Sequence, residues 1–275
     1  MKKTTLAILA SLFALSTQAV AGPVASGFNN LGTVEVCDDC YTNAVTLGFS
    51  ANFLGASFNE TYVSNNGYIT FGKGQGDYTP TGLTADYSGA PIIAPFFSDV
   101  DTRGSNAGSV TYGTGTYAGQ NAFGVTWNQV GYYNSKSDKL NTFQLILVDR
   151  NQTGAGNFDI YFNYDQVQWE TGSADGGTGG LGGTSASAGW ANGTGADGSY
   201  SQLTGSLVNG ALLDGGANAL ISYSNTGVAG QYLYQVRNGV VVAPVPEPET
   251  YAMLLAGLGV VGFMSRRRKQ AKTAA

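Results

Sequence analysis

The feature that most constrains the fold is a series of alternating apolar and polar segments with no amphipathic helix between them. Residues 139–149 alternate through Phe143, Leu145 and Leu147, and residues 156–169 show the same period. A period of two places every second side chain on one face of a strand. Because no helical segment of ten or more residues separates these strands, the sequence predicts a mainly β, single antiparallel sandwich-like domain rather than a parallel sheet.

Glycine and asparagine indicate where these strands turn. Residues 60–72, ETYVSNNGYITFG, predict a hairpin in which Asn66 and Gly67 supply the positive-φ pair of a tight turn. Residues 171–198 are so rich in glycine that they predict a long loop rather than a regular strand. Strand character returns in residues 219–239, which we expect to complete the same domain.

The first 21 residues have the pattern of a secretory signal peptide. Two lysines precede an apolar run over residues 6–15, and Ala19 and Ala21 form a small-residue cleavage site. The mature chain is therefore expected to begin at Gly22, in an oxidising compartment beyond the inner membrane.

The C-terminal segment 245–269 combines an extended proline-containing strip, an apolar stretch over residues 250–264 and a basic cluster. The apolar stretch predicts a short transmembrane helix whose basic flank stays in the cytoplasm. The residues that define this pattern are Val245, Pro246, Glu247, Pro248, Arg266, Arg267, Arg268 and Lys269. The pattern resembles a PEP-CTERM sorting signal. The resemblance implies recognition by exosortase, a membrane enzyme of Gram-negative bacteria that make exopolysaccharide; a plain tail anchor is the alternative.

Between these two segments the chain is strongly acidic. Of its 13 Lys and Arg, seven lie in the terminal segments, which leaves six; of its 18 Asp and Glu, two lie there, which leaves 16. Such a surface repels nucleic acid and anionic lipid headgroups, so nucleic acid is not an expected partner. Divalent cations and neutral glycans remain compatible with it.

Both cysteines, Cys37 and Cys40, lie in the sequence CDDC. In an oxidising compartment this spacing favours a local disulfide. A redox-active pair is disfavoured because the flanking residues do not form a βαβ unit. Zinc is disfavoured because the chain contains no histidine to complete a set of four ligands.

The most distinctive polar motif is SDVDTRG, residues 98–104. On an extended backbone Asp99, Asp101 and Arg103 point to one side. The favoured interpretation is a structural clamp in which Arg103 binds a carboxylate with bidentate geometry. The alternative is Ca²⁺ ligation by Asp99 and Asp101, although Arg103 stands where an EF-hand loop places an oxygen ligand. No other cofactor is expected.

The order of several segments resembles a nidogen-type extracellular (NIDO) domain. They are VSNNGYITFG, APFFSDVDTRG, FGVTWNQVGYY, KLNTFQLILVDR, GNFDIYFNYDQVQWETG, AGW and GQYLYQVRNG. The resulting division is a signal peptide (1–21), an N-terminal segment with CDDC (22–51), a NIDO-like β-domain (52–240, with the loop at 171–198) and the sorting tail (245–269). The resemblance implies an extracellular matrix or adhesive role and transfers no catalytic residue.

The residues are consistent with a protein that is not an enzyme. The chain has no histidine and no G-x-S-x-G nucleophile motif. We therefore expect an exported matrix or adhesion protein, sorted by exosortase and involved in exopolysaccharide-associated biofilm or floc cohesion. The alternative is a glycan-active protein, either a lectin-like binder or a hydrolase that uses a pair of carboxylates, Asp99 with Asp101 or Asp159 with Asp165. Its sugar platforms would be Trp127, Trp169, Trp190, Tyr132 and Tyr133.

Overall fold

The computed structural model describes residues 23–242. The signal peptide and the C-terminal sorting tail with its expected helix lie outside the described residues. Within 23–242 the chain is almost entirely β, with one short 3₁₀ helix, η1 (Asn151–Thr153). None of the helices in this range is long and apolar enough to cross a membrane.

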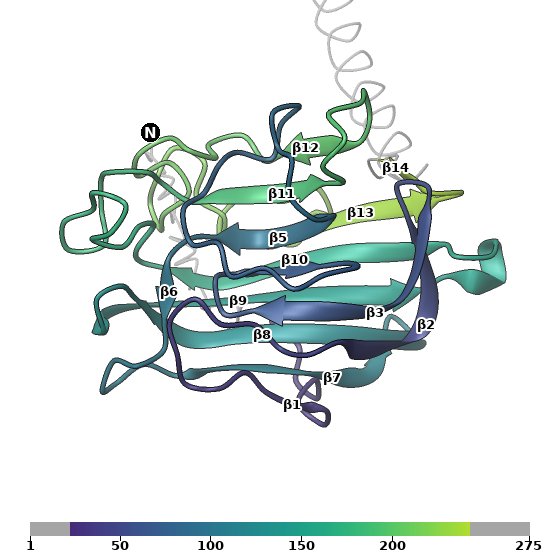
Figure 1. The fold of residues 1–275 in the computed structure, drawn as a ribbon, viewed down its shortest axis with the longest axis horizontal. Coiled ribbons are helices and arrows are strands. Elements are labelled where there is room, and N and C mark those ends of the chain that lie inside the picture. Colours follow the sequence, from purple (N-terminus) through teal and green to yellow (C-terminus); the bar gives the residue numbers. More distant parts are fainter. Residues whose placement is uncertain (1–22, 243–275) are drawn as a thin grey trace, which may run out of the picture.

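The strands form two antiparallel sheets that pack face to face (Figure 1). The larger sheet has the order β1 (Gly32–Thr33), β7 (Ser109–Tyr117), β8 (Gln120–Tyr132), β9 (Lys136–Asp149), β10 (Phe158–Val167), β13 (Gln231–Arg237) and β14 (Val240–Val242), and β6 (Val100–Asp101) also pairs with β8. The smaller sheet has the order β12 (Tyr200–Gln202), β11 (Ser187–Ala191), β5 (Ile92–Phe97), β4 (Tyr68–Thr70), β3 (Ala56–Ser64) and β2 (Val45–Phe53). The predicted antiparallel sandwich is confirmed.

The core lies between the two sheets and follows the two-residue period. From the larger sheet, alternate positions of three consecutive strands point inward and are fully buried. They are Phe123, Val125 and Trp127 of β8; Phe143, Leu145 and Leu147 of β9; and Phe158, Ile160 and Phe162 of β10. The smaller sheet contributes Val63, Ile69, Ile93 and Phe96. Burial of these apolar and aromatic side chains is the main favourable contribution to the stability of the sandwich.

The N-terminal segment covers the outer face of the larger sheet. Phe28 packs against Ile146 and Val148, which alternate with the core residues of β9. Gly124 permits this close approach, because a Cβ there would lie only 2.4 Å from Cγ of Phe28. The expected domain boundary at residue 52 falls inside β2, so the structural domain includes most of the segment that the sequence set apart.

The hairpin predicted at residues 60–72 is present as β3 and β4, but its turn differs from the expected one. Ser64 pairs with Tyr68, so three residues rather than two form the connection. Gly67 has φ 81°, whereas Asn66 is not in the positive-φ region. A Cβ at Gly67 would also collide with the carbonyl oxygen of Phe96. Gly67 is therefore required for two reasons: the turn needs a positive φ at this position, and the packing against Phe96 leaves no room for a side chain.

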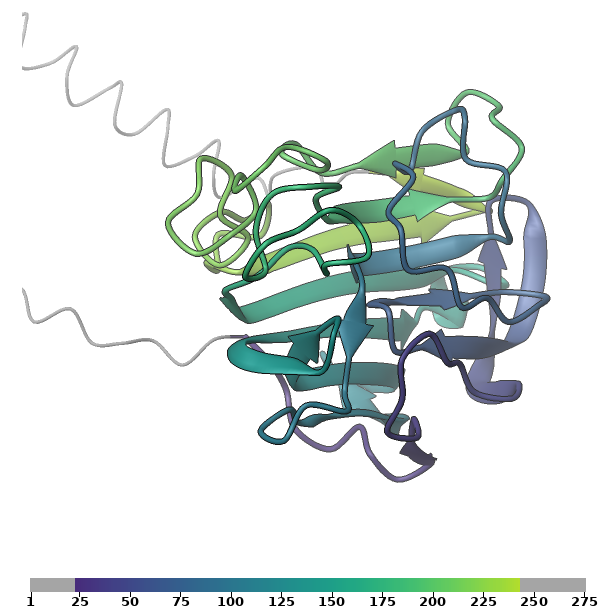
Figure 2. The same cartoon turned by 60° about the vertical axis from the view of Figure 1, so that its left-hand side comes forward.

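The glycine-rich segment 171–198 is not a single loop. Residues Ser187–Ala191 form β11, which lies between β5 and β12 in the smaller sheet. Trp190 is 7% exposed and its ring centroid lies 4.5 Å from that of Tyr234. The long loop predicted from the glycine content is therefore wrong for Ser187–Ala191. These residues form a strand because they pair with β5, and composition does not indicate such a long-range pairing. The part of this segment that precedes β11, residues 171–186, lies at the end of the sandwich opposite β2, whereas the loop that joins β11 to β12 lies at the other end (Figures 1 and 2).

Candidate functional site

The candidate site is built around the disulfide loop, which we define as Cys37–Cys40. The structure joins these two cysteines by a disulfide. Hydrogen bonds of its backbone attach the loop to neighbouring segments: Cys37 N donates to Thr102 Oγ1 at 2.9 Å, Thr102 N donates to Cys37 O at 3.1 Å, and Asn65 N donates to Cys40 O at 3.0 Å. The loop is thereby held against β6 and the β3–β4 turn.

Arg103 forms a clamp next to this loop. Its Nε donates to Asp101 Oδ1 at 2.9 Å and its Nη2 donates to Asp101 Oδ2 at 2.6 Å, which is bidentate geometry. Nη2 also lies 2.9 Å from Asp38 Oδ2. The backbone N–H of Ser135 donates to Asp101 Oδ2 at 2.7 Å. Asp101 is fully buried, and these contacts engage both of its carboxylate oxygens.

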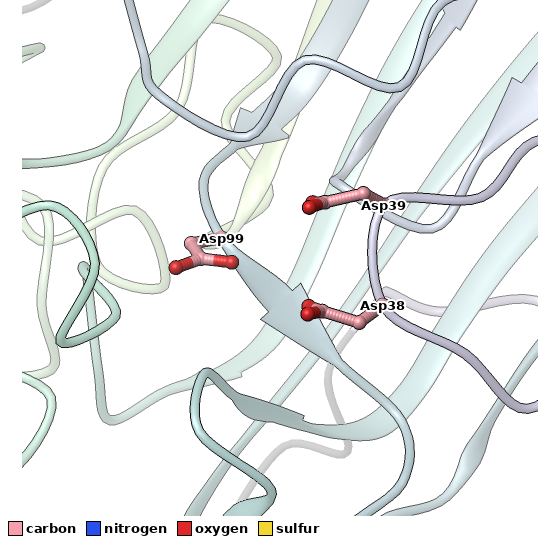
Figure 3. A group of neighbouring side chains, drawn as sticks. All are labelled: Asp38, Asp39 and Asp99. Atoms are coloured by element: carbon pink, nitrogen blue, oxygen red, sulfur yellow. The ribbon is translucent and has the colours of Figure 1, made fainter.

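Asp99 belongs to a different group, which we call the acidic cluster: Asp38, Asp39 and Asp99. One carboxylate oxygen from each residue lies within 4.8 Å of the other two. Figure 3 shows the carboxylates of Asp38 and Asp39 projecting from the disulfide loop toward Asp99. The alternation expected for residues 99–101 therefore does not bring the two carboxylates together as one ligand pair; Asp101 is bound by Arg103, and Asp99 faces the disulfide loop.

Asn66 connects the hairpin turn to the acidic cluster. Its Nδ2 donates to Asp39 Oδ1 at 2.9 Å, and its Oδ1 accepts the N–H of Val100 at 2.9 Å. The side chain is fully buried. A residue that the sequence indicates only as a turn former thus positions both the disulfide loop and the strand after Asp99.

The electrostatics of the two groups differ. Burial and, to a lesser degree, the nearby carboxylates of Asp38 and Asp175 together raise the pKa of Asp99 to about 8. Burial and the charge of Asp39 raise the pKa of Asp38 to about 6, against the opposing effect of Arg103. Burial alone would raise the pKa of Asp101, but hydrogen bonds from Arg103 and Ser135 outweigh it and hold that pKa below its usual value.

Asp38, Asp39 and Asn66 were not among the site residues predicted from sequence. The available signal was the pair of aspartates inside the CDDC loop, because a loop closed by a disulfide presents its two intervening side chains in a restricted geometry. That signal could not indicate Asp99 as their neighbour, since long-range strand pairing brings the two segments together.

Most of the aromatic residues nominated as sugar platforms are buried, although Tyr133 is only half-buried. Trp127 and Trp169 are fully buried and Tyr132 is 3% exposed, so they form core packing rather than sugar platforms. Asp159 is held between Arg150 at 2.6 Å and Arg237 at 2.7 Å. Asp159 and Asp165 are six positions apart on β10, roughly 20 Å along a strand. Catalytic carboxylate pairs of glycosidases lie about 5–9.5 Å apart.

Taken together, the fold and the site define a disulfide-containing β-sandwich domain with an acidic cluster at one end. The chain belongs to the nidogen-like domain family: the family model matches residues 59–238. A second model, the PEP-CTERM protein-sorting motif, matches residues 244–269. These matches confirm both resemblances seen in the sequence and indicate an exported, extracellular protein.

The chain is similar to part of two kinds of animal protein. It is 30% identical to human alpha-tectorin over 189 residues, which cover 60% of this chain and 8% of that protein. It is 28% identical to nidogen of Drosophila melanogaster over 235 residues, which cover 75% of this chain and 16% of that protein. The chain therefore corresponds to a small part of these relatives. No solved structure matches it.

Proposed function

We propose that this protein is a non-enzymatic matrix or adhesion protein that contributes to exopolysaccharide-associated biofilm or floc cohesion. The observation that carries the proposal is the presence, in one chain, of a nidogen-like domain and a PEP-CTERM sorting motif. The motif supports processing by exosortase in a Gram-negative host, through an intermediate anchored in the inner membrane. The domain supports a role outside the cell in contact with exopolysaccharide or other matrix components.

The chemistry of the described residues supports function by contact rather than turnover. The sequence contains no histidine, and the buried Asp159 forms ion pairs with two partly buried arginines. Many copies on one surface can hold cells together through individually weak contacts. The acidic exported domain also disfavours nucleic acid as a partner.

The lectin-like alternative keeps one structural support, a groove beside the disulfide loop. This groove has a volume of about 550 Å³ and its lining includes Tyr41, Tyr112, Glu35 and Asn43. Tyr41 is 49% exposed, so its ring is available for stacking on a neutral sugar. Replacement of Tyr41 by Ala should weaken retention on host exopolysaccharide if this groove holds glycan, and should leave retention unchanged if cohesion uses another surface.

The function is tested by deleting the gene in an exopolysaccharide-producing host and measuring cell aggregation and biofilm cohesion. We expect deletion to weaken both, and the wild-type gene to restore both. The exported protein purified from the host is then incubated with host exopolysaccharide and scored for retention and for released reducing ends. Sustained release of reducing ends, abolished by Asp99→Asn, would place the protein among the hydrolases instead.

The sorting part of the proposal has its own experiment. Replacing Arg266, Arg267, Arg268 and Lys269 by Ser removes the basic cluster without touching the β-domain. We expect impaired membrane retention and processing, measured by cell fractionation and by the size of the mature protein. Unchanged processing and location would contradict the role assigned to the tail.

A further inference from the structure

We propose that Asp38, Asp39 and Asp99 form a binding site for a divalent cation, Ca²⁺ by its ligand chemistry. The inference goes beyond the proposed function and does not depend on it. It differs from the ligand set suggested by the sequence, because Asp101 belongs to the clamp with Arg103 and the disulfide loop supplies two ligands in its place.

The first support is geometric. One carboxylate oxygen of each of the three residues lies within 4.8 Å of the others. Oxygen atoms that bind one Ca²⁺ at about 2.4 Å can lie at most about 4.8 Å apart, so a single ion can contact all three. In Figure 3 the three carboxylates converge from two separate segments of the chain, with one oxygen of Asp99 directed at the two residues of the disulfide loop.

The second support is independent of this proximity: the cluster contains buried carboxylate oxygens without hydrogen-bond partners. Asp99 is only 1% exposed, and no donor within the described residues reaches its Oδ2. Oδ1 of Asp38 is also buried without a donor. Buried polar groups are almost always paired, and a buried charge without a partner is strongly unfavourable. A cation bound to one oxygen of each carboxylate would compensate the charge of the cluster.

The protein does not supply enough positive charge of its own. Arg103 reaches Asp38 Oδ2, but its remaining contacts are with Asp101. The carboxylates of Asp38 and Asp39 lie beside Asp99, and none of the ion pairs found among the described residues includes Asp99. Asp159 provides the internal contrast, since it is equally buried but lies between two arginines.

The ligand type selects among metals. All three side chains offer carboxylate oxygen, the chain has no histidine, and both cysteines are in the disulfide. Oxygen ligands suit Ca²⁺ and Mg²⁺, whereas zinc and softer metals favour nitrogen and sulfur. Ca²⁺ tolerates irregular geometry and completes its coordination with water, and extracellular modules bind it with dissociation constants of about 10⁻⁴–10⁻³ M.

The test uses the exported protein purified from its host, with Ca²⁺ as the probe. Thermal unfolding is recorded in chelator and in 10 mM CaCl₂, and ⁴⁵Ca²⁺ binding is measured by equilibrium dialysis. Because a ligand that binds only the folded state stabilises it by mass action, we expect Ca²⁺ to raise the Tm by about 5 °C. We also expect binding of one ion per chain.

Two variants within the cluster and one control variant outside it separate cation binding from a general effect of salt. Asp99→Asn and Asp39→Asn should each abolish both the Tm shift and ⁴⁵Ca²⁺ binding. Asp159→Asn should lower the Tm in both buffers while keeping the Ca²⁺-dependent shift, because Asp159 lies outside the cluster. Absence of ⁴⁵Ca²⁺ binding to the wild type, or an equal shift in the wild type and Asp99→Asn, would overturn the proposal. Since dialysis measures binding directly, the result does not depend on whether the protein promotes cohesion.

Discussion

Two fully buried aspartates at opposite ends of β9 show how differently one fold can treat the same side chain. Asp159 lies beside Val148, near the C-terminal end of β9, and contacts Arg150 and Arg237. Asp99 lies near the turn that precedes β9, its neighbours are other carboxylates, and none of the ion pairs among the described residues includes it. The first arrangement satisfies a buried charge within the protein. The arrangement around Asp99 leaves its carboxylate without a positively charged partner in the protein. This is typical of a binding site rather than of a structural ion pair.

The largest expected effect is on the arginine-paired end. Asp159→Ala should lower the free energy of unfolding by about 3 kcal/mol, because it leaves two partly buried guanidinium groups without their carboxylate. The measurement is urea denaturation of the purified protein at pH 7. The control is Asp86→Asn at an exposed position, which should change stability by less than about 0.5 kcal/mol. Equal effects of the two substitutions would contradict the conclusion that the ion pairs of Asp159 stabilise the fold.

At the acidic cluster we expect a substitution to increase the free energy of unfolding. In chelator, Asp99→Asn should raise the free energy of unfolding by about 2 kcal/mol, since it replaces a buried carboxylate among like charges with a neutral side chain of similar shape. The same urea denaturation measures it. A loss of stability as large as that of Asp159→Ala would mean that Asp99 is already compensated within the protein.

The pH dependence of stability in chelator should follow from the same cluster. The pKa of Asp99 is raised to about 8 and that of Asp38 to about 6, so between pH 5 and 8 the folded state binds more protons than the unfolded state. Stability therefore falls as pH rises through this window, by at least about 1 kcal/mol. Asp101, whose pKa is lowered, acts at more acidic pH, where its contribution is lost as pH falls.

Unfolding free energies measured at intervals from pH 5 to 8 check this slope. Asp99→Asn should flatten it, and saturating Ca²⁺ should do the same in the wild type, because a bound cation favours the ionised carboxylates. A slope of the opposite sign in chelator would contradict the environment assigned to Asp99.

The smallest effect is expected at the clamp. Arg103→Gln should lower the free energy of unfolding by about 1 kcal/mol, because the Arg103 side chain is 42% exposed and solvent screens its ion pairs. Urea denaturation in chelator and in Ca²⁺ checks this value. We expect a smaller loss in Ca²⁺, which would offset part of the negative charge that Arg103 normally balances. An equal loss in both buffers would show that the clamp and the acidic cluster are energetically independent.

Much of the fold was predictable because its cause is local. The alternation at Phe143, Leu145 and Leu147 follows from strand geometry and the burial of one face, and these residues lie in the core as expected. The hairpin at residues 60–72 was also predictable, since Asn and Gly are favoured in turns for backbone reasons. The motifs SDVDTRG and CDDC identified the two segments that form the site, but not how they share their ligands.

The sequence by itself determined the antiparallel β architecture, the family and the acidic character of the domain, each of which can be identified along the chain. Only the tertiary structure decided that Asp99 faces Asp38 and Asp39 while Asp101 is bound by Arg103. It also decided that Ser187–Ala191 pairs with β5 despite its glycine-rich surroundings. The physical reason is that local periodicity reflects interactions among neighbours in sequence, whereas these contacts depend on how two sheets pair and pack residues that are far apart in the chain.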